Sequence, residues 1–178
     1  NLLRIFFSAP LAAGDEFDVT VAYGGVPPRT TGDSSSYPFN WLTHTHGQER
    51  TPVIFTMSVP DRAWAWWPCK PVLEDKATME LAVTVAEGLT VVSNGSLVGV
   101  QEASGQRRTW RWSHGHPIAT YLVSLAVSDY AVLQDSVTVS SEENDVTIPL
   151  RYYVYQEDST AARTDFARTG EMIKFLSG

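Results

Sequence analysis

Residues 79–100 read MELAVTVAEGLTVVSNGSLVGV and carry the clearest structural signal in the chain. Large apolar side chains occupy every second position from Met79 to Val85, which is the period-two pattern of a strand with one buried face. Asn94-Gly95 lies between the apolar runs 89–92 and 97–100, and both residues tolerate the positive φ that a two-residue hairpin turn needs. The stretch therefore predicts a β-rich fold with a hairpin at Asn94-Gly95.

Further strand patterns extend in both directions from this stretch. Residues 18–23 alternate, and residues 109–112 follow a turn at 104–106, with Trp110 and Trp112 on one face. Residues 119–127 are apolar on both faces, which favours a central strand. Residues 146–155 alternate again, and Pro149 within them predicts an edge position or a bulge.

Two segments do not follow a strand pattern. Residues 24–50 contain Gly-Gly, Pro-Pro and Ser-Ser-Ser runs and predict a long loop, and residues 140–145 predict a short acidic one. From about Thr160 the spacing of Phe166, Ile173 and Leu176 is that of a helix, in which Gly170 weakens the case for one unbroken element. We expect this helix to pack on a part of the protein beyond Gly178.

Composition excludes several classes of protein. The chain has 178 residues, 43% of them hydrophobic and 19% charged, which suits one folded domain rather than a disordered segment. The formal net charge of −7 disfavours binding to nucleic acid or to an anionic membrane surface. No apolar run reaches the roughly 18 residues of a membrane-spanning helix.

Histidine and cysteine offer few catalytic or metal-binding arrangements. His44 and His46 form one i, i+2 pair and His114 and His116 another, but neither pair has further ligands at a recognised spacing, and no H-E-x-x-H occurs. We interpret both pairs as polar loop residues near strand ends. The single cysteine, Cys69, excludes an intrachain disulfide; Lys70 beside it would favour a thiolate, whereas a small buried apolar role suits its context better.

Other residues with possible roles also have simpler structural readings. The chain lacks a G-x-S-x-G nucleophile turn and a phosphate-binding glycine loop. Asn94-Gly95-Ser96 matches a glycosylation acceptor, but the turn explains the same residues. Trp64, Trp66 and Trp67 suit either a packed core or a stacking platform for a sugar, and the core is the commoner use of clustered tryptophans.

A longer series of rare residues resembles one protein family. Residues 53–95 read VIFTMSVPDRAWAWWPCKPVLEDKATMELAVTVAEGLTVVSNG, and residues 109–133 read TWRWSHGHPIATYLVSLAVSDYAVL. Their order and spacing resemble the N-terminal domain of the aminopeptidase N-like zinc metallopeptidases, of the gluzincin type. The marks of the resemblance are Thr56, Trp67-Pro68-Cys69, Lys76, Ser93-Asn94-Gly95, Trp110, and Pro117 through Tyr121-Leu122. Residues 11–25 and 175–178 resemble the flanks of that domain more loosely.

The resemblance implies a mainly β, saddle-like, multi-sheet sandwich over residues 1–158, lacking the family's first strands. It implies that residues 159–178 begin a helical link to a catalytic domain outside this chain. That domain would hold one zinc ion and bind the peptide substrate, so this fragment alone is expected to have no catalytic residue, no metal ligand and no cofactor. Trp67, Pro68, Cys69, Asn94, Gly95 and Tyr121 are implied to be structural, and the Trp-Trp-Pro-Cys-Lys variant resembles bacterial, often exported, members.

The resemblance also implies a contact with substrate and shows where this chain departs from the pattern. In the family, a loop of this domain lies near the free amino end of the peptide, and an ungapped alignment on Pro68-Cys69 assigns Met57, Ser58 and Val59 to it. The Glu or Gln that helps to hold the substrate ammonium is replaced by Val59, and a nearby Asp by Pro71. A weakened, altered or inactive aminopeptidase follows as a hypothesis, because an isopropyl group accepts no hydrogen bond.

Two other functions remain open from the residues. One is a free-standing β-sandwich module that binds carbohydrate or protein through the tryptophan cluster, which requires coplanar, exposed rings. The other is a scaffold domain of an inactive family member. We expect a domain that packs on a zinc aminopeptidase domain and lines the pocket for the first residue of the peptide.

Overall fold

The computed structural model describes residues 3–27, 37–140 and 144–177. The strands are β1 (Phe39–His46), β2 (Glu49–Thr56), β3 (Ala77–Ala86), β4 (Thr90–Ser93), β5 (Ser96–Ala103), β6 (Arg107–Ile118), β7 (Leu125–Ser128), β8 (Tyr130–Ser140) and β9 (Asp145–Tyr155). The helices are α1 (Ser159–Asp165) and α2 (Thr169–Ser177), with 3-10 turns η1 (Ala63–Ala65), η2 (Thr120–Leu122) and η3 (Gln156–Asp158).

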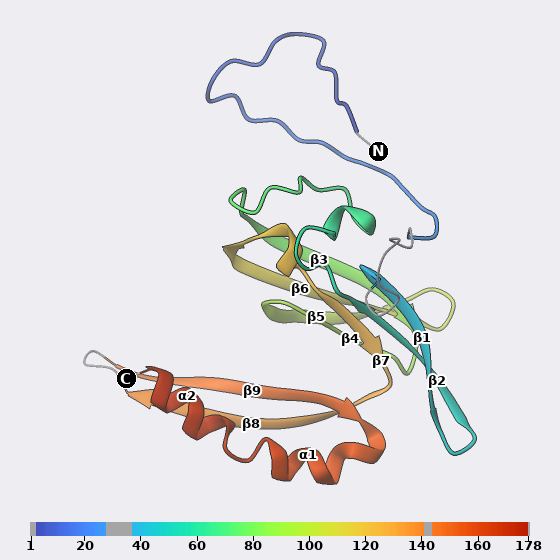
Figure 1. Cartoon of the computed structure of the whole chain (residues 1–178), viewed down its shortest axis with the longest axis vertical. Helices are drawn as coiled ribbons and strands as arrows, with labels where there is room; N and C mark the ends of the chain where they lie inside the picture. The colour runs from blue at the N-terminus through green and yellow to red at the C-terminus, as the bar shows by residue number, and fades with distance from the viewer. Residues whose placement is uncertain (1–2, 28–36, 141–143, 178) are drawn as a thin grey trace.

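The strands form three antiparallel sheets (Figure 1). The four-stranded sheet has the order β1-β2-β7-β4, the three-stranded sheet β3-β6-β5, and the two-stranded sheet β8-β9. The prediction of a mainly β, multi-sheet sandwich with a short helical segment at the end of the chain is confirmed. None of the helices in the described ranges is long and apolar enough to cross a membrane.

The core lies between the three-stranded and the four-stranded sheet. Its buried centre is Val91 on β4, Trp112 on β6, and Leu125 and Val127 on β7. Indole Nε1 of Trp112 donates a hydrogen bond of 3.2 Å to the carbonyl oxygen of Val91, so the polar atom of this large ring is satisfied inside the core. The two sheets are therefore joined by both apolar packing and a directional bond.

The alternation of apolar and polar side chains correctly predicted the strands of the three-stranded sheet. Along β3, the side chains at 79, 81, 83 and 85 are partly buried and those between them are exposed, as period two requires. Across β6, Trp112 pairs with Leu81 and Trp110 with Val83, which puts both tryptophans on the core face. The turn at 104–106 joins β5 to β6, and Gly105 and Gln106 have the positive φ values of 75° and 53°.

The predicted hairpin at Asn94-Gly95 is wrong. Strand β4 pairs with β7 and strand β5 with β6, so the residues between β4 and β5 cross from one sheet to the other. Gly95 has φ +84°, whereas Asn94 has no positive φ. Backbone of β6 approaches this crossing so closely that a Cβ at Gly95 would lie 2.1 Å from the Ser113 carbonyl oxygen. The Asn-Gly signal marked a turn but did not reveal its partners.

Two other strand predictions require correction. Residues 18–23 form no strand, because no other described segment pairs with them. An alternating pattern of side chains does not by itself provide the backbone hydrogen bonds that a strand requires. Residues 119–127 form a strand only over Leu125–Ser128, because η2 occupies the segment before it. That short strand is central, as predicted, with β2 on one side and β4 on the other.

The predicted long loop over 24–50 is also corrected. It contains all of β1 and the first two residues of β2. Pro28 and the serine run 34–36 of that prediction lie outside the described residues, as do residues 141–143 of the acidic loop between β8 and β9. The β1–β2 hairpin was not recognised in the sequence, because its outer half is largely exposed and lacks an apolar face. Polar residues such as Thr43, Thr45 and Arg50 occupy that half.

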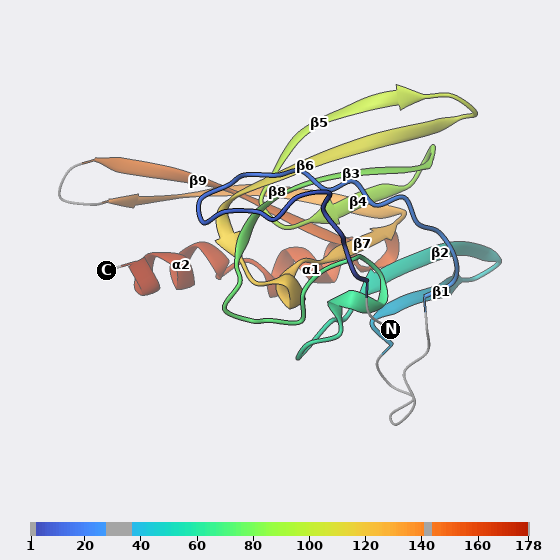
Figure 2. The same cartoon turned by 90° about the horizontal axis from the view of Figure 1, so that it is seen from above.

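The final third of the described chain forms a unit of its own. Among the described residues, strand β9 pairs only with β8, and Pro149 lies opposite Ser136 in an unbroken register, so the predicted edge position is confirmed and no bulge occurs there. Helices α1 and α2 lie along this hairpin (Figures 1 and 2). The predicted helical segment is confirmed, with a break at 166–168 just before Gly170.

The helices do find a surface to pack on, contrary to expectation. Phe166 stacks on Tyr152 with ring centroids 4.6 Å apart, Ala162 is buried, and Gly170 lies against Val137 of β8. The outer side of α2 nevertheless exposes Met172, Phe175 and Leu176.

The crossing at Gly95 predicts a sharp difference between two glycine substitutions. We expect Gly95→Ala to lower the free energy of unfolding by more than about 2 kcal/mol, because a strained positive φ and a backbone clash are both imposed. Gly99→Ala on β5 is the matched control: its φ is ordinary and a Cβ there meets no atom within 4 Å. Urea unfolding of both variants tests this, and equal midpoints for the two would contradict the close approach.

Candidate functional site

The segment after β2 is fixed by three hydrogen bonds. The Met57 amide donates to the Pro38 carbonyl oxygen at 3.0 Å, and the Arg62 amide donates to that of Ser58 at 2.8 Å. Indole Nε1 of Trp66 donates to Ser58 Oγ at 3.0 Å, and Ser58 is only 3% exposed. Ser58 is thus the internal anchor of the segment 57–59.

The two neighbours of this anchor face outward. Met57 is 45% exposed and Val59 is 59% exposed, so the three candidate positions alternate between surface and interior. Thr56, the last residue of β2, accepts a hydrogen bond from the Leu125 amide at its Oγ1, 2.9 Å away, which ties the start of the segment to β7. The structure therefore presents Met57 and Val59 side by side on a well-anchored corner.

The tryptophan cluster is packed rather than laid out as a flat platform. Trp66 and Trp67 are half-buried, their rings are inclined by 57°, and Trp66 lies 6.4 Å from the ring of Phe39. Only Trp64 is largely exposed, at 47%. Stacking on a sugar requires coplanar exposed rings, and this cluster does not provide them.

The residues that follow the cluster have structural surroundings. Burial raises the pKa of the Cys69 thiol above its ordinary value, and a hydrogen bond with the Thr120 side chain opposes part of that rise. Lys70 pairs instead with Asp75, Nζ to Oδ2 at 2.7 Å. Pro68 is exposed and Tyr121 is half-buried in η2. The thiol is therefore held in its protonated, unreactive form, in line with the apolar reading of Cys69.

The side chain of Asn94 fixes Ser124, the residue directly before β7, through hydrogen bonds. Its Oδ1 accepts hydrogen bonds from the amide and the hydroxyl of Ser124, at 2.7 and 3.1 Å. The hydroxyl of Ser93 returns a bond of 2.7 Å to the Ser124 carbonyl oxygen. Together with Gly95, this explains in physical terms why serine, asparagine and glycine follow one another at the crossing between the sheets.

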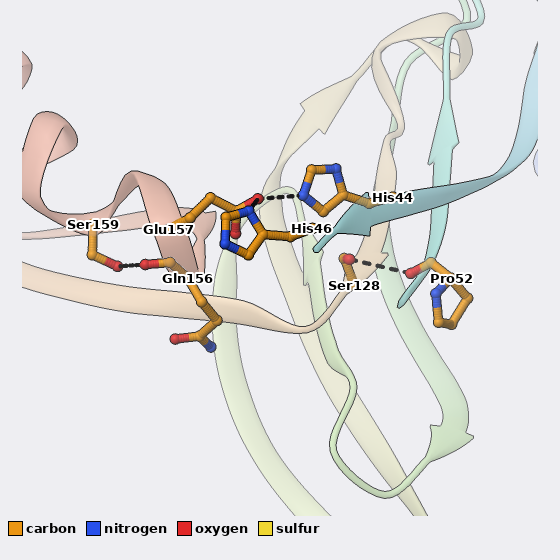
Figure 3. A network of polar contacts seen from close by, with 7 residues as sticks. All are labelled: His44, His46, Pro52, Ser128, Gln156, Glu157 and Ser159. Carbon is orange, nitrogen blue, oxygen red and sulfur yellow. Dashed lines mark hydrogen bonds and ion pairs between the residues drawn. The ribbon is translucent and has the colours of Figure 1, made fainter. Parts of the chain in front are cut away.

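The histidine pairs lie near the ends of strands β1 and β6 and not in loops, and their surroundings differ. His114 donates from Nδ1 to the His116 carbonyl oxygen at 2.7 Å, and the two rings meet edge to face. His44 and His46 instead both face Glu157, which lies 113 residues further along the chain from His44 (Figure 3). Within the residues that the structure describes, no group of three or more His, Cys, Asp or Glu side chains is arranged to hold a metal ion.

Glu157 of η3 contacts both histidines of β1. Its Oε1 lies 2.5 Å from His44 Nε2 and 3.4 Å from His46 Nδ1. The His44 ring lies flat on Tyr155, with centroids 3.9 Å apart and planes inclined by 2°. The pKa of Glu157 lies below its ordinary value, because its own backbone N–H donates to the carboxylate and His44 adds a second hydrogen bond.

A cavity of about 150 Å³ opens beside this contact. Sequence reasoning found the histidines but not Glu157, since nothing in the local pattern of 156–158 distinguishes that residue from an ordinary exposed acid. Period-two spacing places His44 and His46 on one face of β1; only the packing of η3 against that face supplies their partner.

Comparison with known proteins identifies the family. The family model described as the Peptidase M1 N-terminal domain matches residues 1–122, well over half of the chain. Aminopeptidase B of Mus musculus is 23% identical over 171 residues, covering 96% of this chain and 24% of that protein. The chain thus spans about a quarter of the length of this curated relative.

Solved structures give a weaker likeness. The M1 zinc metallopeptidase from Deinococcus radiodurans matches with a TM-score of 0.48 and 21% identity over 56% of this chain and 23% of that one. A mutant of the same enzyme bound to a Tyr-Ser-Ala substrate matches equally well. On the strength of the family match, which includes the segment 57–59, the tryptophan cluster and the crossing at Gly95, the chain belongs to the Peptidase M1 N-terminal domain family.

Proposed function

We propose that this chain is the non-catalytic N-terminal domain of a zinc aminopeptidase-like protein. In this role it packs on the catalytic domain and lines the pocket for the amino-terminal residue of a peptide. The observation that carries the proposal is the family match over residues 1–122, within which Met57 and Val59 stand exposed on an anchored corner. The relative named aminopeptidase B supports the same substrate class.

Rigidity of the corner suits a pocket wall. A wall that selects among side chains must hold its shape, and binding free energy is lost when a contact surface must first be ordered. Ser58 and its bond to Trp66 fix the backbone, so Met57 and Val59 present a preformed apolar surface. An apolar first residue of the peptide is the substrate that such a surface favours.

Recognition of the substrate ammonium is weakened at the same corner. A carboxylate or an amide oxygen accepts a hydrogen bond from an ammonium group, and the isopropyl group of Val59 does not. A hydrogen bond to a charged group contributes about 1.5–3 kcal/mol, so its loss lowers turnover of free-amino substrates. Pro71 removes a further acid expected near this position.

The exposed side of α2 supports packing against another domain. Met172, Phe175 and Leu176 form an apolar strip on a helix whose inner side is already covered by β8. Exposed apolar patches of this kind commonly mark protein interfaces. In the proposed whole protein, zinc belongs to the catalytic domain, and residues 159–178 lead into it.

An inactive relative that keeps this domain as a scaffold is the alternative that the departure at Val59 favours. Sequence downstream of Gly178 distinguishes the two: an active enzyme needs an H-E-x-x-H motif followed by a distant Glu ligand. A free-standing sugar-binding module is disfavoured by the inclined, half-buried rings of Trp66 and Trp67.

Substitution of Val59 tests the role of the corner. In the full-length protein we expect Val59→Glu to raise kcat/KM for aminoacyl substrates by roughly 10- to 100-fold, because the ammonium regains a charged acceptor. Val98→Glu is the matched control, since Val98 is also a largely exposed valine, on β5 and away from the corner. No gain for Val59→Glu, or an equal gain for Val98→Glu, would overturn the assignment.

The isolated chain provides a second test. We expect purified residues 1–178 to retain no stoichiometric zinc after dialysis and to release no amino acid from peptides, because both histidine pairs are engaged in other contacts. Elemental analysis and an aminoacyl-anilide assay measure the two properties. Tight zinc binding that is lost in His44→Ala or His114→Ala would contradict the proposal.

A further inference from the structure

The described chain divides into two parts joined by a narrow junction. The sandwich comprises residues 37–128, and the β8–α2 unit comprises residues 130–140 and 144–177. No strand of the sandwich pairs with β8 or β9 within the described residues. Besides the chain at Asp129, the contacts across the junction include Tyr153 packed against the core, the stack of His44 on Tyr155, a hydrogen bond of 3.4 Å from Gln156 Nε2 to Asp129 Oδ1, and the contacts of Glu157.

The contacts of Glu157 with His44 and His46, here called the clasp, cross this junction. His44 and His46 belong to β1 at the edge of the sandwich, and Glu157 belongs to η3, directly before α1. One carboxylate oxygen meets both imidazoles, as Figure 3 shows. Glu157 therefore connects the β8–α2 unit to the far edge of the other part, beside the stack of Tyr155 on His44.

The charges around the clasp make it dependent on histidine protonation. Glu49 of β2, Asp129 and Glu157 all line the adjoining cavity, and neither lysine nor arginine lines it. His44 and His46 are thus the only lining side chains that can carry positive charge. Histidine is the side chain that gains or loses its charge near neutral pH.

Each histidine state has a different consequence for the junction. A protonated His44 faces the Glu157 carboxylate and lies on the π face of Tyr155, and both contacts favour a cation. When the imidazoles are neutral, three carboxylates share the cavity without a counter-charge, and their mutual repulsion opposes closure. The remaining hydrogen bond to Glu157 is then between a neutral donor and a charged acceptor.

We propose that the clasp is a pH-sensitive lock that fixes the β8–α2 unit against the sandwich under mildly acidic conditions and releases it above neutral pH. Tyr130, which packs beside Tyr155, takes no part, because burial raises its pKa above the ordinary value and the phenol stays neutral.

The acid limit of the lock is set by Glu157. Its pKa is lowered in the folded chain, so its contribution to closure is present above the ordinary value of 4.5. That contribution is lost only as pH falls through the lowered pKa. The carboxylate of Glu157 therefore remains available to the clasp down to its lowered pKa.

Residual dipolar couplings of backbone amides test the lock in the intact 178-residue chain. Near pH 5.5 we expect β3–β6 and β8–β9 to share one alignment tensor; near pH 8 the β8–β9 couplings shrink relative to the others. Glu157→Gln is expected to show the reduced couplings at both pH values. The double variant His44→Gln/His46→Gln removes both titratable charges of the clasp and is expected to remove the pH dependence.

Glu87→Gln serves as the matched control, because Glu87 is also an exposed, ion-paired glutamate, bonded to Arg108 at 3.1 Å within the sandwich. It should behave like the unchanged chain. The proposal would be overturned if β3–β6 and β8–β9 shared one alignment tensor in Glu157→Gln near pH 5.5. The same result for the unchanged chain near pH 8 would also overturn it. The test involves no substrate, so its result is independent of the proposed aminopeptidase role.

Discussion

The contact between Trp112 and Val91 is the one on which the rest of the described sandwich depends. Trp112 stands on the middle strand of the three-stranded sheet, and Val91 on an edge strand of the four-stranded sheet. The indole fills the space between the sheets while its N–H satisfies the Val91 carbonyl. A ring of this size contributes about 2–3 kcal/mol through burial, and an unpaired N–H there would cost a similar amount. Both sheets owe their spacing to this residue.

The position of the candidate pocket wall follows from that arrangement. Packing of the sheets sets β7 between β2 and β4, and β7 holds the end of β2 through Thr56. The corner at 57–59 is then fixed by Ser58 and Trp66. In the proposed enzyme, departures such as Val59 would therefore change the chemistry of the wall without altering its shape. The corner lies at one end of β2 and the junction at Glu157 lies at the other end. There the junction is next to the outer half of β1, the strand that pairs with β2.

Errors in the sequence predictions share one physical cause. Asn94-Gly95 was correctly read as a turn, but its partners were wrong, because turn chemistry specifies local φ and not which strand lies across the gap. Residues 18–23 carry a strand pattern without a strand, since a strand requires hydrogen bonds from a second segment. Strand β1 was missed for the converse reason: its backbone is paired with β2 although many of its side chains are exposed.

Local patterns in the sequence by themselves determined the β-rich class, the buried face of β3, the tryptophans of β6, the final helices and, through a spaced series of rare residues, the family. Those features depend on side-chain periodicity and on residues that only certain backbones accept. The tertiary structure alone decided the sheet order, the crossing at Gly95, the outward display of Met57 and Val59 around Ser58, and the meeting of Glu157 with His44. Each of these joins segments far apart along the chain, and such partners are selected by packing of the whole molecule rather than by any local pattern.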